Sequence, residues 1–235
     1  MERRDRIAAA LDVIETTTAS LTTSPPDEVR QFAAAATMRC CALVRAACVL
    51  EDAGLGHLAG IMERQNWETW VIGLHVLLRG DDALLEVAGD DVHYKRLLSN
   101  KLALGLSYQP DWQGPIKKLN WKELADALGP LLVKEGEALP SSGTTSYDLV
   151  YRTQSLFAVH AGLATIGAYL RYGDDEWAIE PRPDAPFESI GVTSALHCIH
   201  LASYVFRRFG VATEPLEEHS QGFIGVEPGD GGTAA

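Results

Sequence analysis

One hydrophobic stretch, residues 58–78, places ionisable side chains at regular spacing along a single predicted helix. Arg64 and Glu68 stand four residues apart, with His57 before them and His75 after them. At about 100° per residue, these four positions fall within roughly 40° of one another. An arginine with a carboxylate beside it and an imidazole nearby can bind an anion and move a proton. The alternative is a structural i,i+4 ion pair, which stabilises an exposed helix by only about 0.2–0.5 kcal/mol and, if buried, links it to its neighbours.

A second set of polar side chains belongs to a predicted helix that begins at Tyr147. Tyr147 and Tyr151 share one face, Arg152 and His160 lie on or near the apolar face, and Ser155 lies between them. Buried arginine and histidine side chains need partners, because burying an unpaired charge is expensive. One interpretation is an active site in which His160 is the acid or base and Arg152 stabilises phosphate. The other is a satisfied buried network.

The remaining candidate motifs are weak. His197 and His200 face similar directions but have no further ligand at suitable spacing, so the sequence predicts no metal site. The four cysteines form no CxxC pair and are typical of apolar filler in a reducing compartment. Because no nucleotide-binding or hydrolase motif is present, the sequence predicts no cofactor.

Composition bounds the class of protein. The 235 residues include 46% hydrophobic side chains, enough for a core of useful size, and the formal net charge is −12. An acidic surface disfavours nonspecific binding to nucleic acid but leaves room for a local basic pocket. The N-terminus has no signal-peptide pattern, and charges interrupt the apolar runs before the roughly 20 residues that a bilayer requires. We therefore expect a cytoplasmic protein without a membrane span.

Apolar side chains recur at helical spacing through most of the chain, and nothing alternates at period two for long. Pro26, Asp27 and Glu28 predict a helix start with acidic residues at its positive end, and Asn120 is a predicted helix cap. Gly89 and Pro130 are expected to kink or split their helices. A short strand is compatible with residues 177–179. The predicted helices cover residues 2–19, 27–53, 58–79, 81–98, 120–136, 147–170 and 187–209.

These helices predict an all-α fold, a single helical-bundle domain of about seven helices. We expect residues 1–26 to form an N-terminal helix and linker and residues 27–210 to form the bundle. Residues 211–235 are acidic and glycine-rich, which predicts a mobile C-terminal tail.

The order of the motifs resembles a bacterial family of helical proteins catalogued as domain of unknown function 5677. Its RxxxE helix resembles the stretch with Arg64 and Glu68, its tryptophan-led helix begins here at Trp121, and its YxxxYRxxS…H helix resembles the segment that starts at Tyr147. The family is similar in outline to HEPN proteins, helical bundles that include RNase toxins and phage-defence effectors. Seven residues separate Arg152 from His160, more than the HEPN motif places between its arginine and histidine.

Two classes of function follow. The resemblance implies a HEPN-like, metal-independent endoribonuclease or defence effector, with His160 as acid or base, Arg152 and Arg64 as phosphate binders and Glu68 as the orienting carboxylate. Its binding residues would be Tyr147, Tyr151, Ser155 and His75. The alternative is a non-catalytic protein-interaction or small-ligand-sensing module in which the same residues form a structural network. The candidate partners are a second copy of the chain, RNA or another protein. In either case, Arg64 or Glu68 should contact the segment that begins at Tyr147.

Overall fold

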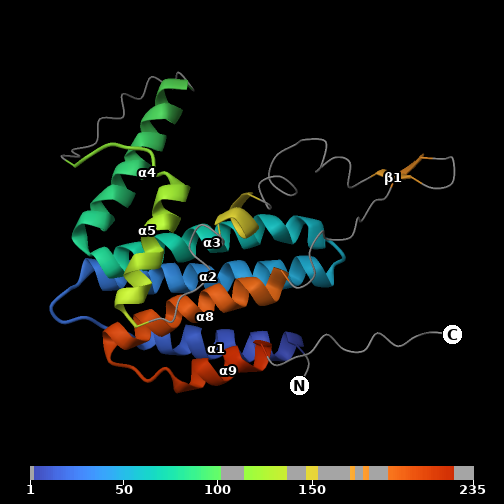
Figure 1. Cartoon of the computed structure of the whole chain (residues 1–235), viewed down its shortest axis with the longest axis horizontal. Coiled ribbons are helices and arrows are strands. Elements are labelled where there is room, and N and C mark those ends of the chain that lie inside the picture. Colours follow the sequence, from blue (N-terminus) through green and yellow to red (C-terminus); the bar gives the residue numbers. More distant parts are fainter. Residues whose placement is uncertain are drawn as a thin grey trace.

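The computed structural model describes residues 3–101, 114–136, 147–152, 170–172, 177–179 and 190–224. These residues form seven α-helices, one π-helical turn and one two-stranded sheet (Figure 1), which confirms the predicted all-α class. The helices are α1 (Arg3–Ser20), α2 (Glu28–Asp52), α3 (Gly56–Arg79), α4 (Asp81–Lys101), α5 (Trp121–Lys134), the π-helical turn η1 (Tyr147–Arg152), α8 (Ile190–Phe209) and α9 (Glu214–Ile224).

The centre of the bundle is the group α2, α3 and α8, which lie side by side and pack most extensively on one another (Figure 1). Small residues bring these helices close together. A Cβ atom at Gly73 of α3 would lie 2.9 Å from Cδ2 of Leu201 and 3.2 Å from Cβ of Ala36. Glycine is required there because α2 and α8 occupy the space that a side chain would take.

The N-terminal helix α1 belongs to the bundle, so the predicted boundary at residue 26 does not separate it from the core. Ile7, Leu11 and Ile14 are buried in the same hydrophobic cluster as the central helices. The Arg4 guanidinium also reaches α2, with its Nη2 atom 2.6 Å from Glu51 Oε2. The apolar spacing of α1 therefore forms a core face.

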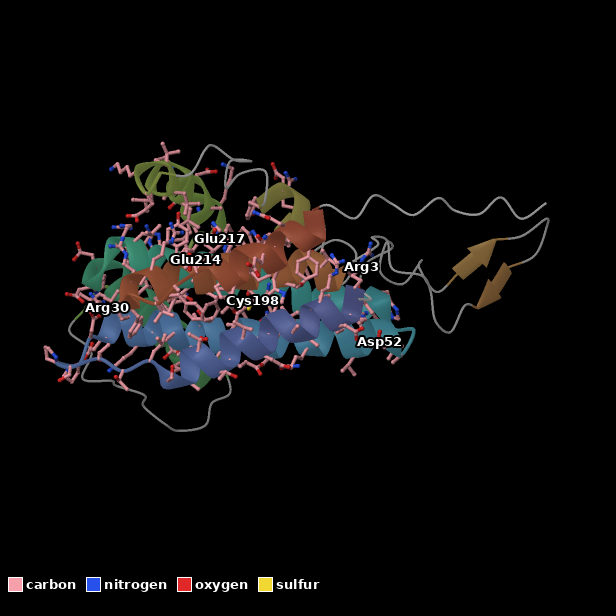
Figure 2. All side chains as sticks on the ribbon, turned by 90° about the horizontal axis from the view of Figure 1, so that it is seen from below. Arg3, Arg30, Asp52, Cys198, Glu214 and Glu217 are labelled. Carbon is pink, nitrogen blue, oxygen red and sulfur yellow. The ribbon has the colours of Figure 1, made fainter. Side chains whose placement is uncertain are left out.

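The prediction of a mobile tail after residue 211 is wrong for residues 214–224, which form α9. Leu216, near the start of this helix, is fully buried, and Phe223, near its end, packs against the core. In Figure 2, Glu214 and Glu217 mark the start of this helix, which contacts α1 and α8. The acidic composition describes the outer side of α9, whereas its apolar residues dock it. Residues 225–235 lie outside the described part of the chain.

Gly89 and Pro130 lie inside continuous helices, α4 and α5, and neither position splits its helix. Gly89 has a different role, because a Cβ atom there would overlap the carbonyl oxygen of Pro115. It therefore permits the segment before α5 to lie directly on α4. The predicted cap of α5 is present, since Asn120 Oδ1 accepts hydrogen bonds from the backbone N–H groups of Lys122 and Glu123.

The predicted helix over residues 147–170 is described only as the π-helical turn at its start, and residues 153–169 lie outside the described part. Its predicted last residue, Leu170, begins strand β1 (Leu170–Tyr172), which pairs antiparallel with β2 (Trp177–Ile179). In the register, Leu170 lies opposite Ile179 and Tyr172 opposite Trp177. The strand that the sequence allows at residues 177–179 is therefore present.

Helix α2 is long and apolar enough to cross a membrane by length and composition alone, with a mean hydropathy of 1.6. Core helices of soluble proteins meet the same criterion. In this fold, Ala33, Cys40 and Val44 of α2 are fully buried in the bundle core. Of the apolar window in α2, 39% is buried inside the bundle.

Candidate functional site

Arg64 is the centre of a polar network that joins α3 to the π-helical turn. Its Nε atom donates to Glu68 Oε1 at 3.1 Å, and its Nη2 atom donates to the Tyr151 hydroxyl at 3.0 Å. The Arg64 and Glu68 side chains are only 14% and 16% exposed. The predicted contact between the Arg64/Glu68 helix and the segment that starts at Tyr147 is therefore present, across 87 residues of sequence.

Beneath this network lies a cluster of four aromatic rings. Trp67 of α3 is fully buried, and its ring centroid lies 5.4 Å from that of Tyr151 and 6.3 Å from that of Trp121. Tyr147 stacks on Tyr151 at 5.0 Å. The Arg64 guanidinium carbon sits 4.3 Å from the Tyr151 ring centroid, a cation–π contact that fixes its orientation.

Helical spacing explains why these groups meet. Arg64 and Glu68 are four residues apart on α3, so they share one face, and Trp67 lies beside them. Trp67 is a residue of this site that the motif pattern does not predict, although its place three residues after Arg64 puts it next to the same face. Gln65 extends the network, because its amide donates to Glu68 Oε2 at 3.4 Å and accepts from Arg39 of α2 at 3.2 Å.

Burial shifts the titration of two members of this network. Burial raises the pKa of the Glu68 carboxyl, an effect that the positive charge of Arg64 opposes. Burial also raises the pKa of the Tyr151 hydroxyl, again opposed by Arg64 and reinforced by Glu68. The arginine therefore offsets part of the cost of desolvating the Glu68 carboxylate.

One donor group of the network is unused. Nη1 of Arg64 is buried and has no hydrogen-bond partner within the part of the chain that the structure describes. Buried polar atoms are nearly always paired, because an unmade hydrogen bond at a buried charged group is expensive. An oxygen of a bound anion is the partner that a guanidinium N–H binds most strongly. Arg64 thus combines a fixed orientation with a donor atom that has no partner among the described residues.

Of the other predicted site residues on the segment that begins at Tyr147, the structure describes Arg152 but not Ser155 or His160. Arg152 is 69% exposed and pairs with Asp148 at 3.1 Å, so the prediction that it lies on or near the apolar face is wrong. In η1 the buried side is formed by Val150 and Tyr151, and Arg152 projects away from it. Ser155 and His160 fall outside the described residues.

His75 does not join Arg64, although both lie on α3. It is 1% exposed, and its Nε2 atom contacts Glu86 at 3.3 Å and Arg79 at 3.1 Å. Seven residues of helix, about 10 Å of rise, separate it from Glu68. His57 lies seven residues before Arg64, near the start of α3. His57, Arg64, Glu68 and His75 thus share one face of α3, but the two histidines belong to local clusters separate from the Arg64–Glu68 pair.

The histidine pair on α8 packs against an aromatic ring. Trp70 Nε1 donates to His200 Nδ1 at 3.0 Å, and the Trp70 ring lies 4.9 Å from the His197 ring. Burial lowers the pKa of His197 to about 4, with a smaller contribution from the charge of His200. Within the described residues, no group of three His, Cys, Asp or Glu side chains is arranged to hold a metal ion.

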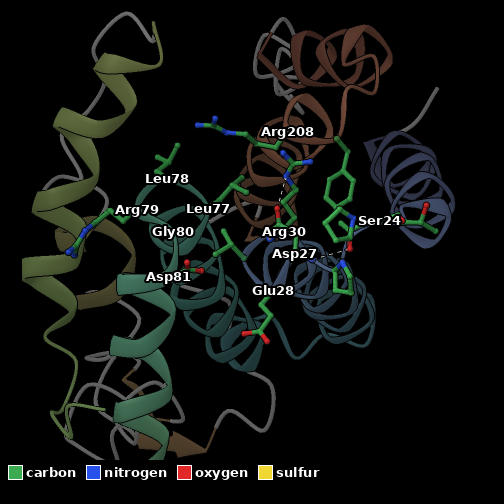
Figure 3. Close-up of a pocket in the computed structure, with 16 residues that line it drawn as sticks. Ser24, Asp27, Glu28, Arg30, Leu77, Leu78, Arg79, Gly80, Asp81 and Arg208 are labelled. Atoms are coloured by element: carbon green, nitrogen blue, oxygen red, sulfur yellow. Dashed lines mark hydrogen bonds and ion pairs between the residues drawn. The ribbon is translucent and has the colours of Figure 1, made fainter. Parts of the chain in front are cut away.

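An open cavity of about 1180 Å³ lies at the end of the bundle where α2 begins and α8 ends (Figure 3). Two of its arginines are already engaged: Arg30 pairs with Asp27 at 3.1 Å, and Arg208 pairs with Glu135 at 2.9 Å. Since these charges neutralise one another, the cavity offers less to a ligand than the Arg64 network does.

Comparisons of the chain with protein-family models, curated proteins and solved structures found no match. The resemblance to the family with the RxxxE helix rests on the motif residues alone. Function must therefore be argued from the site.

Proposed function

We propose that this chain is a HEPN-like, metal-independent endoribonuclease, whose phosphate-binding group is the Arg64 guanidinium. The supporting observation is the buried, unpaired Nη1 atom of Arg64, held in place by Glu68 and Tyr151. A donor held in this way is already oriented for a phosphate oxygen, which reaches it once the side chains that cover it move aside. In a bacterial cell such an activity would serve as a toxin or defence effector.

Cleavage of RNA without a metal requires three functions. A base removes the proton from the ribose hydroxyl that attacks phosphorus, an acid protonates the leaving oxygen, and a cation stabilises the charge on the phosphoryl oxygens. In this proposal His160 takes the proton from the ribose hydroxyl as base and returns it to the leaving oxygen as acid, and Arg64 is the cation, oriented by Glu68. The exposed Arg152 contacts a neighbouring phosphate of the bound strand.

The aromatic cluster fits the same substrate class. Aromatic rings stack on the bases of single-stranded RNA, which every base permits because each has a π-face. Tyr147 and Tyr151 are half-buried and stacked on each other, and in this proposal their solvent-facing side is where a base stacks. Ser155 follows in the sequence as a further hydrogen-bonding group for the strand.

The test is cleavage of a fluorescently labelled single-stranded RNA by the purified full chain in the presence of EDTA. The informative variant is Arg64→Lys, which keeps the positive charge but lacks the planar fork that serves Glu68, Tyr151 and a phosphate together. We expect cleavage by the wild type, about a hundredfold loss in Arg64→Lys and loss in His160→Ala. The matched control is Arg45→Lys, because the partners of Arg45 among the described residues are Asp12 and Glu15 of α1, away from the Arg64 network.

A second candidate function is a non-catalytic interaction module, favoured by the mutual pairing of Arg64, Glu68 and Tyr151 away from solvent. Such a network fixes helix positions and need not touch a substrate. It predicts no RNA cleavage by the wild type and no toxicity on expression, with Arg64→Lys affecting only stability. RNA cleavage that persists unchanged in both Arg64→Lys and His160→Ala would contradict the proposed site and point to a contaminating nuclease.

A further inference from the structure

A cavity of about 400 Å³ lies between the C-terminal half of α3, helix α4 and the segment that leads into α5. It is separate from the Arg64 network, because His75, the cavity residue of α3 nearest to it, lies two helical turns beyond Glu68. Its volume falls in the range of pockets that enclose small organic ligands.

One wall of this cavity is built by a segment with no regular structure, residues 114–120, and two contacts hold that segment in place. The carbonyl oxygen of Pro115 lies against Gly89 of α4, where only a glycine leaves room. The backbone N–H of Leu119 donates to Asp90 Oδ1 at 2.8 Å. The wall is therefore anchored to α4 at both ends, and the cavity is formed before any ligand arrives.

The lining of the cavity is cationic in a chain whose formal net charge is −12. Arg79, Lys117 and Lys118 supply three positive charges, against the two carboxylates of Glu86 and Glu123. A local excess of positive charge on an acidic protein concentrates anions at that one place, because the field of nearby charges dominates within a Debye length.

Both carboxylates of the lining are already engaged. Glu86 accepts from Arg79 Nη1 at 3.3 Å and from Nη2 at 3.4 Å. Glu123 Oε1 accepts from the Asn120 side-chain amide at 2.8 Å. Lys117 and Lys118 are exposed and have no ion-pair or hydrogen-bond partner among the described residues. Two ammonium groups are thus left to meet a ligand from outside.

The ring of His75, which is 1% exposed, forms part of the lining of the cavity. Its Nε2 atom is occupied by Glu86 and Arg79, whereas its Nδ1 atom is buried without a partner among the described residues. Burial lowers the pKa of His75, so the ring is neutral at physiological pH. A neutral imidazole can donate a hydrogen bond from one ring nitrogen and accept one at the other, and it adds no charge to the lining.

We propose that this cavity binds a small organic anion carrying a phosphate or carboxylate group, with Lys117 and Lys118 holding the anionic group at the mouth. The neutral part of the ligand extends inward towards His75. Anions of this chemistry come from two sources, phosphorylated metabolites and polycarboxylates. Both classes present negatively charged oxygen atoms to the two lysines, and the probes below distinguish the classes.

The experiment is isothermal titration of the full-length chain with adenosine monophosphate, inorganic phosphate and citrate at low salt. We expect saturable binding of at least one organic anion and weaker binding of inorganic phosphate, which has no group to fill the inner part of the cavity. Preference for the nucleotide over citrate assigns the phosphorylated source, and the reverse assigns the polycarboxylate.

Variants of the lining residues test whether the anion binds in this cavity. Replacing both lysines, K117Q/K118Q, should weaken binding by about tenfold for each ammonium group that pairs with the anion. The matched control is Lys134→Gln at the far end of α5, which should leave the affinity unchanged. Gly89→Ala keeps every charge but displaces the wall at Pro115, so it should also reduce binding while circular dichroism reports an intact bundle.

Two results would overturn the proposal. One is the absence of saturable binding of all three probes at millimolar concentration. The other is an equal loss of affinity in Lys134→Gln and K117Q/K118Q, which would mean that the anion responds only to the overall charge. RNA cleavage by the Arg64 site is measured independently of either result, so the two proposals can fail separately.

Discussion

Removing the Arg64 side-chain charge tests the central network most directly. Arg64→Met keeps an unbranched apolar stem against the Tyr151 ring but leaves Glu68, which is 16% exposed, without its cation. Breaking a buried ion pair by removing one partner costs about 3–5 kcal/mol. Since this pair retains some solvent contact, we expect about 3 kcal/mol at pH 7, at the low end of that range.

The complementary variant, Glu68→Gln, should cost less, about 1 kcal/mol, because its amide oxygen still accepts from Arg64 Nε and the guanidinium stays stacked on Tyr151. In a double-mutant cycle the two changes should therefore not add. We expect a coupling energy of about 1–2 kcal/mol, compared with about 0.2–0.5 kcal/mol for an i,i+4 pair on an exposed helix.

The Arg64→Met variant has a characteristic pH dependence of stability. Burial raises the pKa of Glu68 while Arg64 lowers it, so removing Arg64 raises the folded-state pKa further. The folded chain then holds a proton at pH values where the unfolded chain has released it, and its stability falls as pH rises through that interval. The penalty of Arg64→Met should therefore shrink as the pH is lowered from 7 towards the ordinary pKa of a glutamate.

Urea unfolding followed by far-ultraviolet circular dichroism measures these free energies for the wild type, both single variants and the double variant. A loss below about 0.5 kcal/mol in Arg64→Met, typical of surface substitutions, would refute the inference that the pair is desolvated. A penalty that is the same at pH 5 and pH 7 would show that Glu68 is not the group left uncompensated.

Three further predictions concern the bundle. Burial lowers the pKa of His197 to about 4, so its stabilising contribution, up to about 3 kcal/mol, is complete above pH 6.5 and is lost as pH falls towards 4. His197→Gln should flatten that part of the pH–stability profile, and parallel profiles would contradict the shift. Gly73→Val places a side chain against Leu201 and should cost about 3 kcal/mol in urea unfolding; an unchanged midpoint would refute the close approach of α3 and α8. Leu216→Ala removes a fully buried side chain and should cost about 2–4 kcal/mol, whereas a mobile tail would show no loss in the same assay.

Helix starts were predictable from the sequence because the groups that cap a helix are local. Asp27 Oδ1 accepts from the Arg30 N–H at 2.9 Å, and Asn120 caps α5 in the same way. Even here one detail differs. Glu123 stands at the position that completes a capping box by reaching the backbone of the cap residue, but in the structure it accepts from the Asn120 side chain at 2.8 Å.

Helix α9 shows how composition can hide a short helix. Its acidic residues and the glycines that follow it suggested a tail, because low hydrophobicity and high charge are typical of disorder. The informative signal was positional: Thr213 precedes a proline and an acidic first turn, and Leu216 and Phe223 then fall seven residues apart on one face. Two well-placed apolar side chains are sufficient to dock eleven residues of helix.

The Arg64–Tyr151 contact was predictable because α3 is a regular helix with a regular polar stripe. The orientation of Arg152 was not, because residues 147–152 form a π-helical turn. A wider turn rotates each residue by less than the 100° of an α-helix, so facing angles computed for an α-helix place its later residues incorrectly. An α-helical pattern from the sequence carries no sign of this change.

The cavity lined by His75, Lys117 and Lys118 could not be predicted from the sequence, for a different reason. Its wall, residues 114–120, belongs to a segment that the sequence marks only as irregular, and periodicity says nothing about where such a segment docks. The one local clue was Gly89, an isolated glycine inside a helical pattern, which often marks a close backbone approach. The net charge of −12 also pointed away from anionic partners. That total governs the distant field, whereas a ligand inside a cavity responds to the side chains within about 10 Å of it, and there the lysines outnumber the carboxylates left unpaired.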